Sequence, residues 1–205
     1  MDLEKHLEQV ESKWLNSSFD FLKNKFTTTP LPSHDHQHHL RVWKYAKDLL
    51  LQLSRQNITA DSHLIEALLL SSMFHDAGMI KVKGDEHGKA SIEIFREYLA
   101  DLGENPENLE VIEHAIEKHD DKSYTLAGRL IVDGKIQLLP ALHISDDLDA
   151  LGNIGIFRYS EIYLLRGIPF EDLGLKIIAN LSGRYGNFMA NCSRLPQMIM
   201  THSVR

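Results

Sequence analysis

Apolar residues recur at three- and four-residue spacing along most of the chain, which is the pattern of amphipathic helices. Residues 3–25 predict a first helix. This helix should end before the segment TTTPLPS, because Pro30 and Pro32 favour an extended connection. A second helix should follow, with an apolar stripe that runs from Val42 to Leu53.

A third helix should occupy the centre of the protein. Its residues from Leu64 to Phe74 are apolar almost all round, and a helix without a polar face must be covered on every side. Asp61 or Ser62 can cap its amino end, and Gly78 stands where the helix should stop.

Two more helices are predicted before residue 120. The first carries its apolar residues between Ser91 and Leu102 and ends at Gly103. The second should have Asn105 as its N-cap and Pro106 as its first residue, since proline fits the first turn of a helix.

The last third of the chain mixes strand and helix signals. The segments RLIV (129–132) and KIQLL (135–139) flank the turn signal DGK and predict two short strands. Helical spacing returns after Pro140, and the segments RGIP, SGRYGN and RLPQM should interrupt the one or two helices that remain. The chain is therefore predicted to be all-α, with one small β-hairpin near residues 129–139.

Composition narrows the possible functions. The 205-residue chain, long enough for one domain, carries a net charge of −7, whereas nucleic acids and anionic membranes select clustered Lys and Arg. Cys192 is the single cysteine, which excludes an intramolecular disulfide and fits a reducing compartment. The apolar runs are shorter than the ~18 residues of a membrane span. No signal-peptide pattern follows Met1, so we expect a cytoplasmic protein.

The pair His75-Asp76 ends the central apolar stretch and is the first strong chemical signal. A carboxylate buried there costs free energy unless a partner compensates its charge. Two interpretations stay open. Either the helix reaches solvent at Asp76, with Gly78 as its C-cap, or the pair binds a divalent transition ion, which imidazole nitrogen and carboxylate oxygen suit.

The segment SHDHQHHLRV is the second candidate. His38 and Arg41 are three residues apart, so both can project from the first turn of a helix toward one side. His34, His36 and His39 point elsewhere or belong to the preceding loop. Any one of these histidines, taken alone, is more often solvated than a ligand.

Two more segments carry acidic residues and histidines. In SDDLDALG, Asp146 or Asp149 could turn inward, although such charge runs are usually solvated. Further upstream, His119 shares the helical face of Ile112, whereas His114 lies on roughly the opposite side. A histidine on an apolar face is either a hydrogen-bonded core residue or a ligand.

The ordered set HHLRV, FHDAG, HAIEKH and HISDDLDALGNIGIFR resembles the HD-domain superfamily of metal-dependent phosphohydrolases, over residues 33–160. The opening HDHQHHLRV is similar to a bacterial branch with the pattern HDxxHxxRV. The resemblance implies a single-domain, all-α helical bundle of HD type at residues 33–205. Residues 1–32 would form an N-terminal helix and a linker that pack on this core.

The resemblance also assigns roles to individual residues. Its metal ligands fall on His38, His75, Asp76 and Asp146. These four leave positions for water and substrate on an octahedral ion such as Mn²⁺, Mg²⁺, Fe²⁺, Co²⁺ or Ni²⁺. The expected catalytic residues are His87 and His119, as candidates for the general acid, and Asp149, beside the ligands. The candidate substrate-binding residues are Lys81, with its neighbour Lys83, and Arg158 and His114.

Two features depart from the family pattern. The family usually has DADRLDA, whereas this chain has ISDDLDA, so Ile144 and Asp147 replace an aspartate near the ligands and an arginine that faces phosphate. The interval between His119 and Asp146 is also longer, and the predicted hairpin lies in it. The resemblance therefore leaves the substrate open.

The resemblance implies hydrolysis of a phosphoester or phosphoanhydride bond in a nucleotide or another small phosphorylated metabolite, by metal-activated water. Two other functions stay open. Some members of the superfamily hold two irons and oxidise small molecules with O₂, and the altered ISDDLDA would also suit a non-catalytic module that binds a nucleotide or a metal. A homodimer stays open as the assembly.

Overall fold

The computed structural model describes residues 3–29, 31–84, 86–121 and 129–192. Two features of the sequence prediction, Pro30 and the segment RLPQM (194–198), lie outside these residues. Among the helices that are described, none combines the length and the apolar character needed to cross a bilayer.

The described chain is almost entirely helical. Its α-helices are α1 Leu3–Phe26, α2 His36–Ser54, α3 Ser62–Phe74, α4 His87–Leu102, α5 Leu109–Lys118, α6 Leu138–Ala150, α7 Gly152–Leu165 and α8 Leu173–Cys192. Short 3-10 helices lie at Pro32–His34, Ala77–Ile80 and Phe170–Asp172, labelled η1, η2 and η3. The strands β1 Ile131–Val132 and β2 Lys135–Ile136 pair antiparallel as a hairpin. The all-α prediction with one small hairpin is confirmed.

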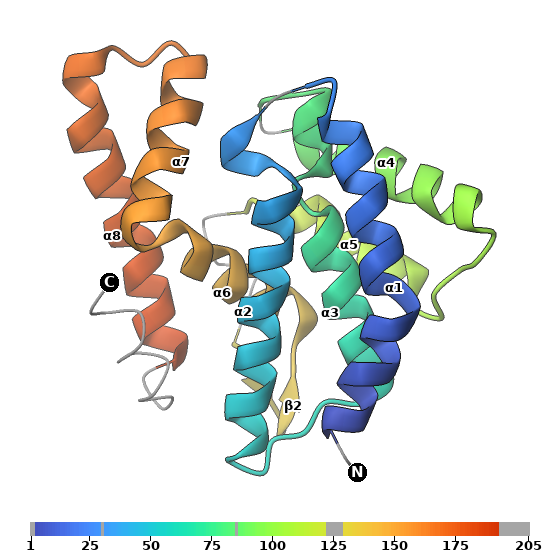
Figure 1. The fold of residues 1–205 in the computed structure, drawn as a ribbon. Helices are drawn as coiled ribbons and strands as arrows, with labels where there is room; N and C mark the ends of the chain where they lie inside the picture. The colour runs from blue at the N-terminus through green and yellow to red at the C-terminus, as the bar shows by residue number, and fades with distance from the viewer. Residues whose placement is uncertain (1–2, 30, 85, 122–128, 193–205) are drawn as a thin grey trace.

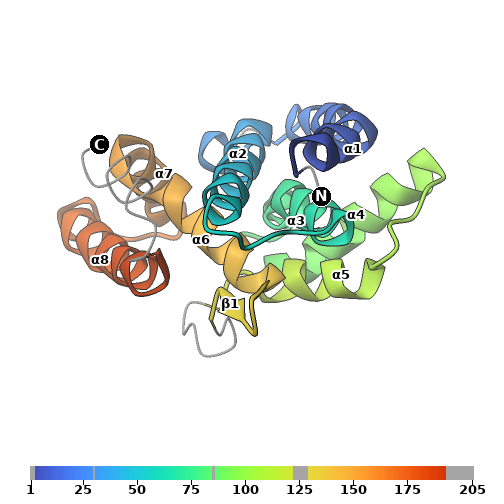
Figure 2. The same ribbon diagram turned by 90° about the horizontal axis from the view of Figure 1, so that it is seen from below.

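Helix α3 lies at the centre of the bundle, as its apolar surface predicts. It contacts α1, α2, α4, α5 and α6, and all its residues from Ala67 to Phe74 are buried. Asp61 caps it by accepting a hydrogen bond from the amide nitrogen of Leu64 at 2.8 Å. Figure 1 shows α1, α2 and α3 side by side, and Figure 2 shows α6 crossing below them toward α7.

Helices α7 and α8 form an antiparallel pair at one side of the bundle (Figure 1). A small apolar cluster fixes this pair to η1 and η2; its buried members are Leu31, Met79, Ala150, Tyr159, Ile162, Leu173 and Ile177. Gly155 allows α7 to start tightly against α6, because a Cβ at this position would lie 1.5 Å from the carbonyl oxygen of Ala150. The polar residues of α7 and α8 are thereby held against α6.

Several predicted boundaries are wrong. Helix α3 ends at Phe74, before Gly78, and α6 begins at Leu138, inside the predicted strand 135–139. Helix α5 begins at Leu109 with Asn108 as its N-cap, because Pro106 is buried in the connection that follows α4. The segment SGRYGN lies inside α8 and does not interrupt it. Each glycine in a helix costs only about 1 kcal/mol, and burial of Phe188 in the main core offsets this cost.

Candidate metal centre

Four side chains from three parts of the fold converge on one buried point: His38 in the first turn of α2, His75 and Asp76 after α3, and Asp146 on α6. The Nε2 atoms of His38 and His75 lie 3.1 Å apart, and each is 3.8 Å from Oδ1 of Asp146. One ligand atom of each residue lies within 4.8 Å of the others. The structure thus brings together all four residues predicted as metal ligands.

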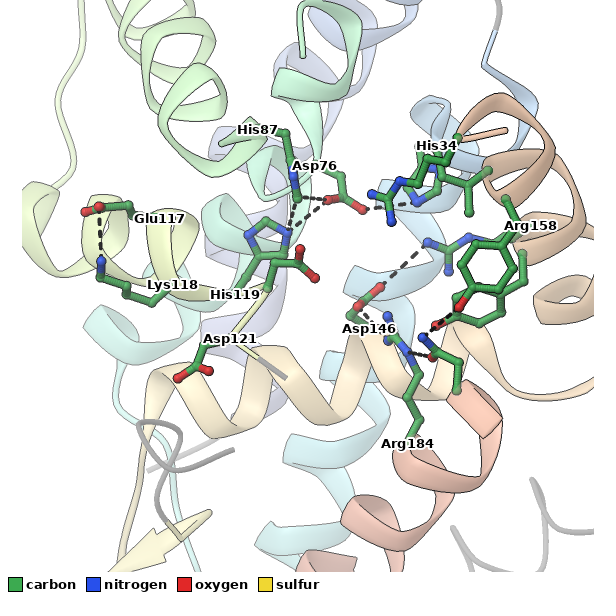
Figure 3. A pocket seen from close by; sticks show the side chains of 16 residues that line it. His34, Asp76, His87, Glu117, Lys118, His119, Asp121, Asp146, Arg158 and Arg184 are labelled. Atoms are coloured by element: carbon green, nitrogen blue, oxygen red, sulfur yellow. Dashed lines mark hydrogen bonds and ion pairs between the residues drawn. The ribbon is translucent and has the colours of Figure 1, made fainter. Parts of the chain in front are cut away.

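Asp76 belongs to two groups of possible metal ligands. The first group is His38, His75, Asp76 and Asp146, and the second group is Asp76, His87 and His119. Its Oδ2 lies 3.3 Å from His38 Nε2 and 3.4 Å from His75 Nε2. Its Oδ1 lies 3.0 Å from His87 Nε2 and 2.9 Å from His119 Nε2. Figure 3 shows His87 and His119 on one side of Asp76. A carboxylate placed in this way can serve two ions, one with each oxygen.

Each of the four histidines in these groups forms a hydrogen bond through Nδ1 and directs Nε2 toward the other ligand atoms. Each places Nδ1 within 2.9 Å of an oxygen that can only accept a hydrogen bond; the acceptors are Oδ2 of Asp149 for His38 and the backbone carbonyls of Ser72, Gly84 and Ile116 for His75, His87 and His119. Nδ1 therefore carries the proton, and in the neutral ring Nε2 presents a lone pair. This arrangement is typical of histidines that bind metals through Nε2.

The chemistry of the donor atoms fits a cation. The Nε2 atoms face one another in two pairs, at 3.1 Å for His38 and His75 and at 3.0 Å for His87 and His119. Carboxylate oxygens of Asp76 complete both groups. Lone pairs and negative charge gathered this closely require protons or metal ions among them, and mixed nitrogen and oxygen donors suit a divalent transition ion.

Two arginines, the partly exposed Arg41 and the buried Arg158, compensate the charge of Asp149, which was predicted as a catalytic residue. Asp149 is 1% exposed and accepts hydrogen bonds from Arg41 Nε at 2.6 Å and Arg158 Nη1 at 2.9 Å. Burial raises the pKa of Asp149, but the hydrogen bond from His38 and the nearby guanidiniums outweigh burial and hold it well below its usual range. The ionised carboxylate orients the His38 ring.

The sequence prediction missed Arg184 of α8. Its Nη1 donates to Oδ2 of Asp146 at 2.9 Å and to Oδ1 of Asp147 at 2.8 Å. Asp147 also accepts from Asn187 Nδ2 at 2.9 Å. The residue that replaces the family arginine is therefore a fully buried carboxylate paired with an arginine from another helix, while Ile144, the other departure, is buried in the main core.

A cavity of about 520 Å³ opens beside the two metal groups. It is lined by Asp76, His87, His119 and Asp146 and, from α7 and α8, by Arg158 and Arg184. Figure 3 shows Arg158 and Arg184 approaching Asp146 from different sides. This volume lies in the range of small-molecule sites, which is about 300–1,000 Å³.

The structure does not bring all predicted substrate-binding residues to this cavity. Arg158 lines it, with Nη2 at 3.1 Å from His38 Nε2. Lys81 instead pairs with Glu93 at 3.0 Å, its neighbour Lys83 is exposed, and His114 is exposed on α5. These three side chains do not line the cavity.

The remaining histidines of the opening segment have different surroundings. His34 lines the cavity, and its Nε2 is 3.7 Å from Oδ2 of Asp76. His36 packs edge-on against Phe19. His39 is fully buried, and its ring contacts the rings of Phe26, His38 and His75. Only His38 of this segment belongs to either metal group.

Gly78 packs against the first turn of α4, which carries His87 of the second ligand group, without room for a side chain. A Cβ at this position would lie 2.1 Å from the carbonyl oxygen of His87 and 2.5 Å from the amide nitrogen of Ser91. We expect Gly78→Ala to displace the first turn of α4, to destabilise the protein by about 1–3 kcal/mol, and to weaken Mn²⁺ binding. Urea unfolding and a Mn²⁺ titration measure both effects. Gly84→Ala is the control, because nothing lies within 4 Å of its Cβ position, and equal behaviour of the two variants would contradict the prediction.

The stability of the metal-free protein should fall as the pH rises from neutral. Burial lowers the pKa of His75, but the charges and hydrogen bonds of Asp76 and Asp146 outweigh burial and raise it to about 9. Because this value exceeds the ~6.5 of an unfolded histidine, the bound proton stabilises the fold fully below pH ~6.5, and this contribution is lost as the pH rises to about 9.

Urea unfolding in EDTA between pH 6.5 and 9 measures this loss, which should be about 3 kcal/mol. His75→Gln should remove the decline. The control His114→Gln, at an exposed position of α5, should keep it. A stability that is constant over this range in the unmodified protein would refute the assignment of the proton to His75.

Comparisons with known proteins agree with the fold. The family model described as HD domain matches residues 36–153. A crystal structure of a Lactobacillus plantarum protein, a target of the Northeast Structural Genomics programme, superposes over 100% of both chains with a TM-score of 0.50 and 13% identity, which supports the fold alone. The sequence matches none of the curated proteins. Because the match to the family model spans more than half of the sequence, the chain belongs to the HD domain family.

Proposed function

We propose that this protein is a metal-dependent phosphohydrolase that cleaves a phosphoester or phosphoanhydride bond in a nucleotide or another small phosphorylated metabolite. The HD superfamily consists largely of metal-dependent hydrolases. One observation carries the proposal: members of both ligand groups line the same cavity as the guanidiniums of Arg158 and Arg184. These members are Asp76, Asp146, His87 and His119. Phosphoryl transfer needs both parts, a metal site and fixed cations.

The metal ligands and the arginines of the site have different roles in the proposed reaction. Divalent ions in such a site supply a water of lowered pKa and polarise a phosphoryl oxygen. The Nδ1 hydrogen bonds to Asp149 and to three backbone carbonyls fix the histidine rings, and Asp76 connects the two ligand groups through its two oxygens. Arg158 and Arg184 compensate negative charge on the phosphoryl oxygens, and because both are almost fully buried, little solvent has to reorganise during the reaction.

The pKa values of the neighbouring histidines His87 and His119 are shifted in opposite directions. Burial lowers the pKa of His87, but Asp76 outweighs burial and raises it above its usual value. Burial dominates at His119 and lowers its pKa. When no ion occupies the group of Asp76, His87 and His119, His87 is therefore the better general acid of the two, because its raised pKa favours the protonated ring that can donate to the oxygen of the leaving group.

A screen of metals against substrates tests the proposal. Protein stripped with EDTA and loaded with Mn²⁺, Co²⁺, Ni²⁺ or Mg²⁺ is mixed with nucleoside mono-, di- and triphosphates and generic phosphoesters, and release of phosphate or pyrophosphate is measured. We expect turnover with at least one ion, and no turnover by His38→Ala. Silence under every condition would count against hydrolysis, and nucleotide binding without turnover would indicate a non-catalytic module.

A di-iron oxygenase is the second candidate, and the pair His87 and His119 favours it. These two histidines and Asp76 form a second group of possible ligands beside the first, as a pair of irons would require. Protein purified without added metal should then contain two irons per chain and take up O₂ with a small organic substrate. The guanidiniums of Arg158 and Arg184 in the cavity favour the phosphorylated substrate instead.

A further inference from the structure

Arg184 is a cation that α8 places inside the cavity. Its side chain is 11% exposed and lines the cavity. The ring of Tyr159 lies against its guanidinium at 5.6 Å, and its Nε donates to Oδ1 of Asn180 at 3.3 Å. An arginine buried to this degree loses much of its hydration, so it must be paired with anions.

Asp147 and Asn187 hold this guanidinium in place. Asp147 is 0% exposed, and its two oxygens accept from Arg184 Nη1 and from Asn187 Nδ2. Asp147 does not line the cavity, whereas Arg184 does. The carboxylate therefore acts on the cavity through Arg184, by fixing its position and balancing its charge.

The other anion beside Arg184 is itself a predicted metal ligand. Nη1 of Arg184 lies 2.9 Å from Oδ2 of Asp146, and Nη2 of Arg158 lies 3.8 Å from Oδ1 of the same carboxylate. The same Nη1 serves both Asp146 and Asp147, and within the described ranges no group pairs with Nη2 of Arg184. One edge of the guanidinium is thus left for an anion in the cavity.

Resting on the phosphohydrolase function, we propose that Arg184 binds a phosphate group of the substrate and that Asp147 and Asn187 are the positioning residues that aim it. A divalent ion bound by Asp146 would weaken the hydrogen bonds of this carboxylate to both guanidiniums, because the positive charges of the ion and the guanidiniums would repel one another. The phosphate oxygens of the substrate would then accept the hydrogen bonds that the guanidinium of Arg184 no longer gives to Asp146. The planar fork of arginine suits two oxygens of one phosphate.

The test compares the unmodified protein with Arg184→Gln. Both are loaded with Mn²⁺ and titrated with inorganic phosphate and with pyrophosphate by calorimetry, and the Mn²⁺ affinity is measured by competition with a chelating dye. We expect Arg184→Gln to weaken phosphate binding at least about 10-fold. The Mn²⁺ affinity should stay equal or increase, because a cation that competes for Asp146 is gone. A purely structural arginine would instead lower the Mn²⁺ affinity when removed.

Two further variants complete the test. Arg184→Lys keeps the charge beside Asp147, and thereby the fold, but its ammonium is a point charge without a fork, so phosphate binding should fall to an intermediate level. Arg96→Gln makes the same charge change at an exposed arginine paired with Glu113 and should bind phosphate normally. Unchanged phosphate affinity in both Arg184 variants would overturn the proposal and leave the hydrolase function standing. An unmodified, Mn²⁺-loaded protein that binds neither anion would overturn both.

Discussion

Replacing Asp76 with asparagine is expected to abolish metal binding at both ligand groups, together with hydrolysis. The two carboxylate oxygens face different pairs of histidines, with Oδ1 at 3.0 and 2.9 Å from His87 and His119. An amide has one oxygen and an NH₂ group that only donates, so asparagine cannot offer a ligand oxygen to each of the two groups. Loss of several kcal/mol of transition-state stabilisation corresponds to a fall in turnover of about 1,000-fold or more.

The metal content after Mn²⁺ loading and gel filtration measures this effect, alongside the rate of phosphate release. Asp146→Asn is the informative comparison, because Asp146 belongs to the first group alone and the second group should survive its loss. Asp48→Asn changes an exposed carboxylate of α2 and should be silent. A folded Asp76→Asn protein with full metal content would show that Asp76 is not a ligand.

Asp149→Ala is expected to have the largest effect on stability. Its carboxylate accepts from Arg41, from Arg158 and from His38 Nδ1, the last at 2.8 Å. Truncation leaves Arg158, which is 7% exposed, without this partner, and breaking a buried ion pair in this way costs about 3–5 kcal/mol. His38 also loses the acceptor that fixes its tautomer, so Mn²⁺ affinity should fall by about 10–100-fold.

Urea unfolding and Mn²⁺ titration separate the two consequences of Asp149→Ala. Arg41→Gln serves as the matched control, because it removes one partner of Asp149 at a position whose side chain is 27% exposed and keeps the other two. Its cost should be clearly smaller. Equal stabilities of the two variants would contradict the view that Asp149 organises the buried charges around His38.

The helices follow from local pattern wherever one face or every face of a segment is apolar. Helix α3 illustrates this, since its apolar run from Leu64 to Phe74 predicts its central place in the bundle. Local pattern misleads where packing decides. Gly183 and Gly186 predict a break, yet α8 continues through both, because Phe188 on one side and Ile177 on the other are buried against different parts of the bundle.

The candidate ligands could be found from sequence because a known motif carries them. His38, His75, Asp76 and Asp146 match that motif at recognisable spacings, and the structure brings all four together. Lys81 is the counterexample among the substrate-binding candidates. A lysine in a polar loop carries no pattern that tells which way it points, and here it pairs with Glu93 away from the cavity.

Local pattern accounts for the helical class and the buried centre, because burial of apolar surface is non-directional and leaves a periodic trace along the chain. The family motif marks the candidate ligands. The packing of separate helices, in contrast, places Asp76 in two groups of possible metal ligands and brings Arg184 to Asp146 and Asp147, across 38 and 37 positions of sequence. Such charge pairs depend on the placement, to within about 1 Å, of side chains from separately packed helices, which no local pattern records.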